Sequence, residues 1–206
     1  MKTLWEKWSK EDLKKVNTFC EDYRQFLSVS KTEREFTENS RVLCEKHGFK
    51  NIAEMETLQA GDKVYSINRN KNICLFVIGK KPLTDGMNIL GAHIDSPRLD
   101  IKQKPLYETE GLALLDTHYY GGIKKYQWTA RPMALHGVVC KTNGETVNVV
   151  IGEDPADPVV GITEILVHLS ADQMKKSASE VVEGEALDVL VGSIPKKKEE
   201  KDPVKA

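Results

Sequence analysis

The stretch MNILGAHIDSPRLD, residues 87–100, decides how we interpret the fold of this chain. Its first six residues, 87–92, form a short and continuous apolar run, which is typical of a β-strand buried on both faces. The run leads directly into His93, and Ser96-Pro97 then forces the backbone out of regular strand geometry. We therefore expect a central strand that ends at a histidine, on the side of the sheet where α/β folds bind their ligands.

His93 and Asp95 lie two positions apart at the end of this expected strand. Side chains with that spacing point to the same face of a strand. A neutral imidazole is a good zinc ligand, and a nearby carboxylate fixes its tautomer or orients a neighbouring group. From the spacing alone the alternative stays open, and it is the more common case: a strand-end histidine that is satisfied by a local hydrogen bond.

Upstream of this stretch, the first 48 residues predict two helices. Ser9 with Asp12, and Thr32 with Glu35, have the spacing of a capping box, and Gly48 is a plausible C-terminal stop. We expect the apolar residues at helical spacing to pack in the core. They are Leu13, Val16, Phe19, Tyr23, Phe26 and Leu27 in the first helix and Phe36, Val42 and Leu43 in the second.

From about residue 62 the pattern changes to that of β-strands. Residues 64–79, VYSINRNKNICLFVIG, predict two strands joined by a turn around residues 69–72. Residues 98–135 show little periodicity and are broken by glycines and Pro132. Residues 135–142 and 145–151 flank Asn143-Gly144, the strongest short hairpin signal in the chain.

A third apolar run and the order of the elements complete the predicted organisation. Residues 162–169 are apolar and predict a strand or a buried turn of helix. The order of helices, hairpin and buried strand predicts an α/β fold in two parts. We place the first part at residues 1–100, a β-rich second part at 101–194, and a charged tail or linker at 195–206.

Composition excludes several classes of partner. The formal net charge is -1, with 30 basic and 31 acidic side chains, so neither nucleic acid nor an anionic membrane is expected as a partner. The N-terminus lacks the apolar region of a secretory signal, and no apolar run approaches the roughly 20 residues of a membrane helix. We therefore expect a soluble cytoplasmic protein. The cysteines form no CxxC pair and are expected to be buried reduced thiols; they are Cys20, Cys44, Cys74 and Cys140.

Residues 91–139, which begin with GAHIDSPRLD and include YYGGIKKYQW at 119–128, resemble the M18 (aspartyl aminopeptidase) family of metallo-aminopeptidases, and its bacterial branch in particular. The helical opening through SKTERE, residues 30–35, is also similar. The later ITEILVHLS, residues 162–170, resembles the short His-Leu motif of that family. The resemblance covers most of residues 1–195.

The resemblance implies a fold, an activity and site residues. The expected fold is part of a two-zinc exopeptidase-type α/β domain plus a β-rich inserted oligomerisation domain. The expected activity is removal of N-terminal residues, acidic ones in many members, from a peptide substrate by two zinc ions, within a homo-oligomer. His93 matches the first zinc ligand, and Asp95 matches the acidic residue that supports the metal site. His168 matches a histidine that contacts the substrate in an active site, apparently that of a neighbouring subunit, or that ligates metal; both roles stay open.

The chain departs from the family where the other metal ligands are expected. The resemblance implies that the bridging aspartate, the glutamate pair, a further acidic ligand and a C-terminal histidine follow the inserted domain. The one Glu-Glu pair, Glu199-Glu200, lies among lysines and is interpreted as solvated tail. The chain alone is therefore expected to bind metal poorly and to hydrolyse little. A truncated gene product, one piece of a split enzyme and an incomplete sequence all fit this pattern.

Two functions remain after the sequence analysis. The first is the N-terminal part of a zinc aminopeptidase. The alternative is a non-catalytic oligomerisation or assembly module derived from such an enzyme. In either case the sheet of residues 1–100 is expected to keep an unpaired edge, which tends to aggregate or to find a partner.

Overall fold

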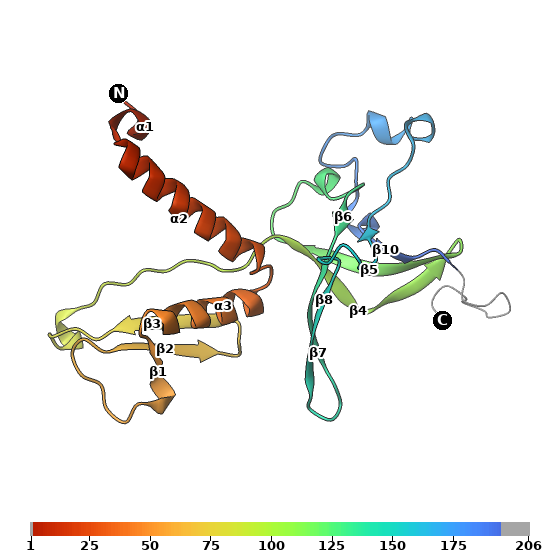
Figure 1. Ribbon diagram of the computed structural model, residues 1–206. Helices are drawn as coiled ribbons and strands as arrows, with labels where there is room; N and C mark the ends of the chain where they lie inside the picture. The colour runs from red at the N-terminus through yellow and green to blue at the C-terminus, as the bar shows by residue number, and fades with distance from the viewer. Residues whose placement is uncertain (1, 195–206) are drawn as a thin grey trace. The chain divides into compact units, whose positions relative to one another are not determined.

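The computed structural model describes residues 2–194 and divides into two units, which are presented separately (Figure 1). Unit 1 is Met1–Asp95 and unit 2 is Ser96–Ala206. The boundary that we predicted at residues 100 and 101 falls inside a continuous strand, β4 (Arg98–Thr109), whereas the structural division lies just before that strand. The predicted tail, residues 195–206, lies outside the described residues.

Unit 1 begins with three helices, α1 (Leu4–Lys7), α2 (Lys10–Ser28) and α3 (Glu33–Lys46). Both predicted capping boxes are confirmed. The backbone N–H of Asp12 donates to the Ser9 hydroxyl over 3.1 Å, and the Ser9 N–H donates back to the Asp12 carboxylate over 3.1 Å. Thr32 and Glu35 make the same reciprocal pair at the start of α3. Capping of this kind satisfies backbone donors that the first helical turn leaves free.

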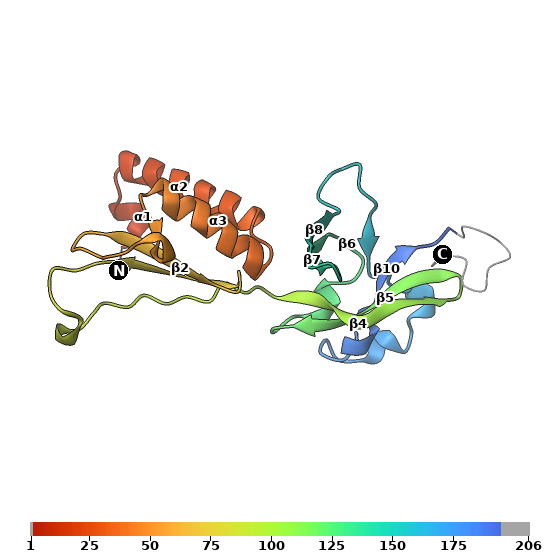
Figure 2. The same cartoon turned by 90° about the horizontal axis from the view of Figure 1, so that it is seen from below.

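A three-stranded sheet with the order β1-β2-β3 completes unit 1. Its strands are β1 (Lys50–Asn51), β2 (Lys63–Asn68) and β3 (Asn72–Val77). The predicted hairpin is confirmed, with Arg69 and Asn70 at positive φ in its turn. Helix α3 packs on one face of this sheet (Figure 2), where the Tyr65 hydroxyl donates to Glu45 over 2.7 Å.

Three expectations for unit 1 are wrong, and one of them is the core stripe of α3, in which Val42 and Leu43 are exposed. Residues 87–92 form no strand, and no backbone hydrogen bond described within residues 2–194 involves them. Without a neighbouring strand their apolar side chains stay in solvent, and Leu90 is fully exposed. The apolar stripe of α2 is not core either, because none of the 19 residues of that helix is buried. Helix α2 contacts α3 through the edge-to-face pair of Phe26 and Phe36, whose ring centroids lie 5.0 Å apart.

Unit 2 is organised around a five-stranded sheet with the order β4-β5-β10-β9-β6. Its largest part, the long hairpin of β4 and β5, was not expected from the sequence. The turn of this hairpin places Glu110 and Gly111 at positive φ. The register of this hairpin shifts between Ile101 and Leu106, where Pro105 cannot donate a ladder hydrogen bond. That irregularity explains why the alternation of apolar and polar residues, which is typical of a strand, is hard to recognise in this part of the sequence. The other strands of the sheet are β5 (Leu112–Tyr120), β6 (Pro132–Met133), β9 (Val160–Gly161) and β10 (Val189–Gly192).

The core of unit 2 lies where this sheet meets the loops that return to it. Its buried cluster consists of Val160, Ile162, Val182, Leu187 and Val189. Polar groups next to the cluster are paired. The Thr117 hydroxyl donates to the Leu187 carbonyl over 2.5 Å, and the Tyr107 hydroxyl donates to Asp188 over 2.6 Å. Since buried polar groups are costly unless they are bonded, these contacts fix β4 and β5 against the segment before β10.

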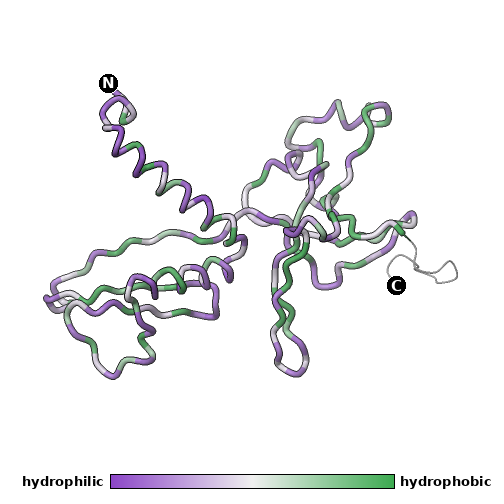
Figure 3. The backbone as a smooth tube through the Cα atoms, viewed as in Figure 1, coloured by the Kyte–Doolittle hydropathy of each residue, from purple (hydrophilic) through white to green (hydrophobic). Residues whose placement is uncertain are grey.

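Strands β7 (Leu135–Cys140) and β8 (Thr146–Ile151) form a separate two-stranded ribbon, as predicted. Its turn carries Gly144 at φ +85°, whereas Asn143 is not at positive φ. The connection is therefore not the two-residue turn that Asn-Gly usually makes. Figure 3 shows hydrophobic residues along both strands. The register places one all-apolar face on this ribbon, made of Leu135, Gly137, Val139, Val147, Val149 and Ile151.

Short 3-10 turns connect the strands of both units. They are η1 (Ile52–Glu54) and η2 (Leu83–Asp85) in unit 1, and η3 (Lys125–Gln127), η4 (Val167–Leu169), η5 (Gln173–Lys175) and η6 (Gly184–Ala186) in unit 2. The prediction for residues 162–169 holds only at Ile162, which is buried; the rest is neither a strand nor a buried helical turn. Among the described residues, no helix is both long enough and apolar enough to cross a membrane.

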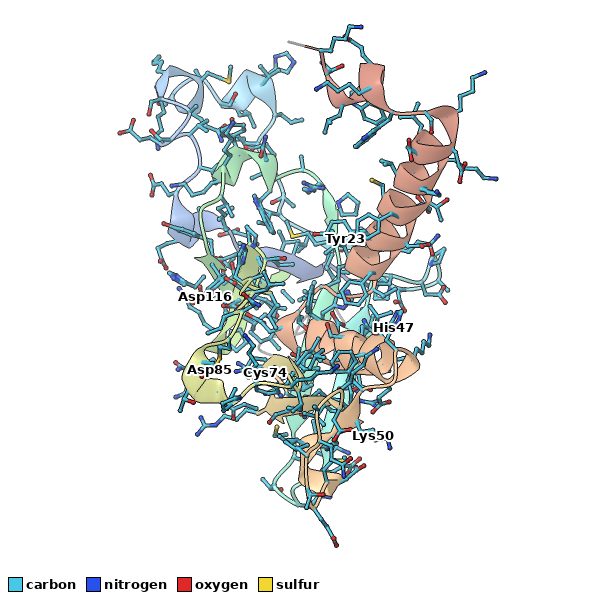
Figure 4. All side chains as sticks on the ribbon, turned by 90° about the vertical axis from the view of Figure 1, so that its left-hand side faces the viewer. Tyr23, His47, Lys50, Cys74, Asp85 and Asp116 are labelled. Atoms are coloured by element: carbon cyan, nitrogen blue, oxygen red, sulfur yellow. The ribbon has the colours of Figure 1, made fainter. Side chains whose placement is uncertain are left out.

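The expectation of buried thiols is confirmed for one cysteine and wrong for three. Cys44 is buried on α3, and burial raises the pKa of its thiol. Cys20, Cys74 and Cys140 are exposed, and Cys74 is labelled on β3 in Figure 4. These three lie on elements whose apolar surfaces are themselves open, namely α2, β3 and the β7–β8 ribbon. The exposed thiols therefore follow from incomplete burial of these elements.

Candidate metal centre

His93 and Asp95 contact each other at the end of the extended segment that leaves unit 1. The Nδ1 atom of His93 lies 2.9 Å from the Asp95 carboxylate and 3.1 Å from the Asp95 backbone carbonyl. Both partners are acceptors, since a carboxylate at neutral pH carries no proton to donate. The hydrogen must therefore sit on Nδ1 of the imidazole.

This hydrogen bond leaves the Nε2 lone pair of His93 free to bind a cation. In metal sites, one ring nitrogen commonly donates to a carboxylate or carbonyl while the other ligates the metal. The His93 side chain is 84% exposed, so nothing in unit 1 blocks access to Nε2. The pair therefore fits one ligand position of a zinc ion, together with the group that orients this ligand.

The remaining ligands of such a centre are not grouped within the described part of the chain. In residues 2–194, no cluster of three or more His, Cys, Asp or Glu side chains is placed to hold a metal ion. Zinc sites require about four ligands, three of them from the protein in catalytic sites. His93 alone meets only part of that need.

His168 lies in unit 2, on the 3-10 turn η4, and is exposed. The buried strand or helical turn that we predicted around it does not form. Its neighbours Leu166, Val167 and Leu169 are exposed too, so this turn presents apolar side chains and one imidazole to solvent. His168 belongs to unit 2, whereas His93 belongs to unit 1. The role predicted for His168 stays a prediction.

Two basic residues, Arg98 and Lys102, follow the site, and an unpaired cation at this place would attract an acidic substrate. Arg98 donates to Asp100 over 2.7 Å and stacks over the Tyr120 ring at 4.0 Å. Lys102 lies 2.8 Å from Asp116 and 2.7 Å from Glu185, and hydrogen bonds from these carboxylates, Asp116 first, raise its pKa. Both cations are already paired with carboxylates of unit 2, which weakens the case for a substrate contact.

The structure also pairs a second histidine with a carboxylate. The Nε2 atom of His136, on β7, lies 2.9 Å from the Glu153 carboxylate. The two residues are 17 positions apart, and the pairing of His136 with Val150 across the ribbon brings them together. No short motif signals such a contact. It ties the loop after β8 to β7.

Comparison with known proteins shows which family this chain resembles. The family described as "Aminopeptidase I zinc metalloprotease (M18)" matches residues 26–206. An M18 family aminopeptidase 1 of Clostridium acetobutylicum is 53% identical over 209 residues, covering 99% of this chain and 45% of its own length.

Solved structures agree with the sequence match. The crystal structure of an M18 aminopeptidase from Thermotoga maritima gives a TM-score of 0.90 at 40% identity, over 99% of this chain and 44% of that one. The crystal structure of aminopeptidase I from C. acetobutylicum gives 0.85 at 51% identity, over 99% and 46%. The chain therefore spans less than half the length of these relatives. On this evidence the chain belongs to the M18 family of zinc metallo-aminopeptidases.

Proposed function

We propose that this chain supplies His93, held by Asp95, as one ligand of the zinc centre of an M18 aminopeptidase. The supporting observation is the bond from Nδ1 to the Asp95 carboxylate, which leaves Nε2 as the ligating atom. The complete centre holds two zinc ions, and its other ligands come from the part of the family sequence that has no counterpart in these 206 residues. The chain by itself binds zinc weakly and is inactive.

The reaction is hydrolysis of the first peptide bond of a peptide. When bound, zinc polarises the scissile carbonyl and lowers the pKa of an attacking water. The role of this chain is positional: Asp95 holds the His93 ring in one tautomer and one orientation. Contacts of this kind typically change metal affinity or activity by about 10–100-fold when they are removed.

The substrate class, the assembly and the compartment belong to the same proposal. N-terminal residues, acidic ones among them, are removed from peptides in the cytoplasm, and His168 contacts the substrate in an active site. The enzyme is a homo-oligomer in which unit 2 makes subunit contacts. The all-apolar face of the β7–β8 ribbon supports this part, because such a face is usually covered in an assembly.

The test uses a chimera in which residues 1–195 of this chain replace the matching part of the C. acetobutylicum relative. Zinc content is measured by atomic emission, and turnover is measured on aspartyl and leucyl p-nitroanilides. His93→Ala should lose zinc and lower kcat/KM by at least about 100-fold, whereas Asp95→Asn should lower zinc affinity by about 10–100-fold. His47→Ala, at an exposed histidine of the same unit, serves as the matched control.

Unchanged zinc content in the His93→Ala chimera would remove His93 from the metal site. A chimera that assembles but neither binds zinc nor hydrolyses either substrate would favour the alternative, a non-catalytic assembly module. A higher kcat/KM on the aspartyl than on the leucyl substrate would support the preference for acidic residues.

A further inference from the structure

The first residues of unit 2 are held in place by the end of strand β5. In the β4–β5 ladder, Arg98 pairs directly with Tyr120, and its guanidinium lies over the Tyr120 ring at 4.0 Å from the centroid. A cation at this distance from an aromatic face is attracted by the ring. Arg98 also donates to Asp100 over 2.7 Å. The start of β4 is therefore defined by side-chain contacts as well as by the ladder.

Pro97, immediately before this strand, packs against Gly121. A Cβ atom built on Gly121 would lie 3.6 Å from the Cα atom of Pro97 and 3.7 Å from its Cγ atom. A methyl group would just fill this space, and a larger side chain would have to displace Pro97. Gly121 also adopts φ +80°, a conformation that favours glycine. The dipeptide Tyr120-Gly121 thus contacts two consecutive residues, Pro97 and Arg98.

The link from this anchor back to Asp95 is stiff. Only Ser96 lies between Asp95 and Pro97. The ring of a proline fixes its own φ, and it restricts the preceding residue to extended conformations. An anchor at Pro97 and Arg98 therefore limits the directions in which the backbone of Asp95 can point.

The contact between His93 and Asp95 depends on that backbone direction. The Nδ1 atom of His93 lies near two acceptors of Asp95, its carboxylate at 2.9 Å and its backbone carbonyl at 3.1 Å. Rotation of a side chain cannot bring a carbonyl into place, so the main chain has to present it. On the other side of the pair, no backbone hydrogen bond described within residues 2–194 involves residues 87–92. The restraint we can trace through the described contacts comes from the residues after Asp95.

From these observations we infer that Tyr120 and Gly121 are positioning residues for the pair of His93 and Asp95. They fix the start of β4, and the stiff link before β4 carries this restraint to Asp95. Asp95 in turn keeps the hydrogen of the imidazole on Nδ1. The inference deepens the zinc role proposed for His93 and rests on it, although the restraint on the ring needs no metal.

The first readout is the tautomer of His93 in the full chain without metal. Nitrogen NMR of the imidazole at mildly alkaline pH, where the ring is neutral, distinguishes a hydrogen on Nδ1 from one on Nε2. The signals of His93 are identified by their absence from His93→Ala. We expect the wild type to carry the hydrogen on Nδ1, and we expect Tyr120→Leu and Gly121→Leu to lose this preference. The second readout is the zinc affinity of the chimera described above, which each variant should lower by about tenfold.

Matched controls separate positioning from a general loss of stability. Gly111, at the turn of the same hairpin, has φ +73° and nothing within 4 Å of a Cβ atom, so Gly111→Leu strains the backbone without touching Pro97. Tyr126→Leu removes a ring of unit 2 that is 41% exposed, against 39% for Tyr120. Both controls should keep the tautomer and the zinc affinity of the wild type. Tyr120→Phe keeps an aromatic face over Arg98 and should do the same.

Two results would overturn the inference: a wild-type tautomer in folded Tyr120→Leu and Gly121→Leu, or equal losses in these variants and their controls. If Gly121→Leu does not fold, the comparison of Tyr120→Leu with Tyr120→Phe decides. A zinc affinity that falls with His93→Ala but with neither variant would leave the proposed function standing without this inference. A chimera that binds no zinc, while the two variants still change the His93 tautomer in the full chain, would argue against the proposed function and leave the positioning role intact.

Discussion

Unit 2 buries a contiguous cluster of five apolar side chains, while the buried apolar residues of unit 1 are Cys44, Val64 and Tyr65. Both units contain regular, well-capped or well-turned elements, so the difference does not lie in local structure. It lies in what the elements pack against. In unit 2, segments far apart in the chain return to one sheet, as when Asp188 receives bonds from Tyr107 and Thr117. In unit 1 the contact between Tyr65 and Glu45 joins α3 to the sheet, but the apolar side chains of Met87, Ile89 and Leu90 stay exposed.

The contrast teaches that apolar patterning and burial are separate properties. Residues 87–92 and the stripe of α2 have the pattern of core residues and the exposure of surface residues. Apolar surface stabilises the folded state only to the extent that folding removes it from water. A helix or strand with an uncovered apolar side therefore adds little to the stability of unit 1 until a partner covers that side.

The largest effect expected from this contrast comes from truncating one leucine in each unit. Leu187 is fully buried in the core of unit 2, and Leu187→Ala should lower the free energy of unfolding of that unit by about 3 kcal/mol. Leu90→Ala, at a fully exposed position of unit 1, should change stability by less than about 0.5 kcal/mol. Urea denaturation followed by hydrogen exchange in each unit measures both. Equal losses at the two sites would remove the contrast.

A smaller effect on stability is expected from removing the Tyr107 hydroxyl, which donates to Asp188 beside the unit 2 core. Burial, and then the bond to Asp188, raise the pKa of Tyr107 to about 12. Because the folded state favours the neutral phenol, this stabilisation is complete below the ordinary pKa of 10.0 and is lost as pH rises from 10 to 12. Tyr107→Phe should cost about 2 kcal/mol at pH 7 and should remove this alkaline loss.

Thermal melts of the wild type and of Tyr107→Phe at several pH values between 8 and 12 test the prediction. Tyr126→Phe, at an exposed tyrosine of the same unit, is the control and should follow the wild type. If Tyr107→Phe and the wild type lost stability in parallel above pH 10, the phenol would not be the responsible group.

The smallest effect is expected at Thr37 on α3, in unit 1. This residue is 1% exposed, and its hydroxyl oxygen finds no hydrogen-bond partner among the described residues. An unsatisfied buried hydroxyl is costly, and valine has nearly the same shape. Thr37→Val should therefore raise the stability of unit 1 by up to about 1 kcal/mol, as measured by urea denaturation. A clear loss of stability would show that this hydroxyl is bonded in solution.

Several features could be predicted because they depend on residues close in sequence. The capping boxes at Ser9 and Thr32 and the hairpin turn at Arg69 each involve neighbours within a few positions, and all three are present in the structure. The side-by-side arrangement of His93 and Asp95 has the same origin, although the strand expected to carry them is absent. The hairpin of β4 and β5 was missed, since Pro105 and the shifted register hide its alternation.

Nearby residues are enough to predict where helices begin, where the chain turns and which histidine has a carboxylate within reach, since each follows from short-range sterics and hydrogen bonding. Which apolar residues are buried depends instead on how distant segments fold together. Burial requires partners from distant parts of a chain: unit 2 contains them at Leu187 and Val189, and residues 87–92 of unit 1 have none within the described chain. The same physical reason limits the metal centre, because one ligand can be read locally while the others must be brought to it by folding.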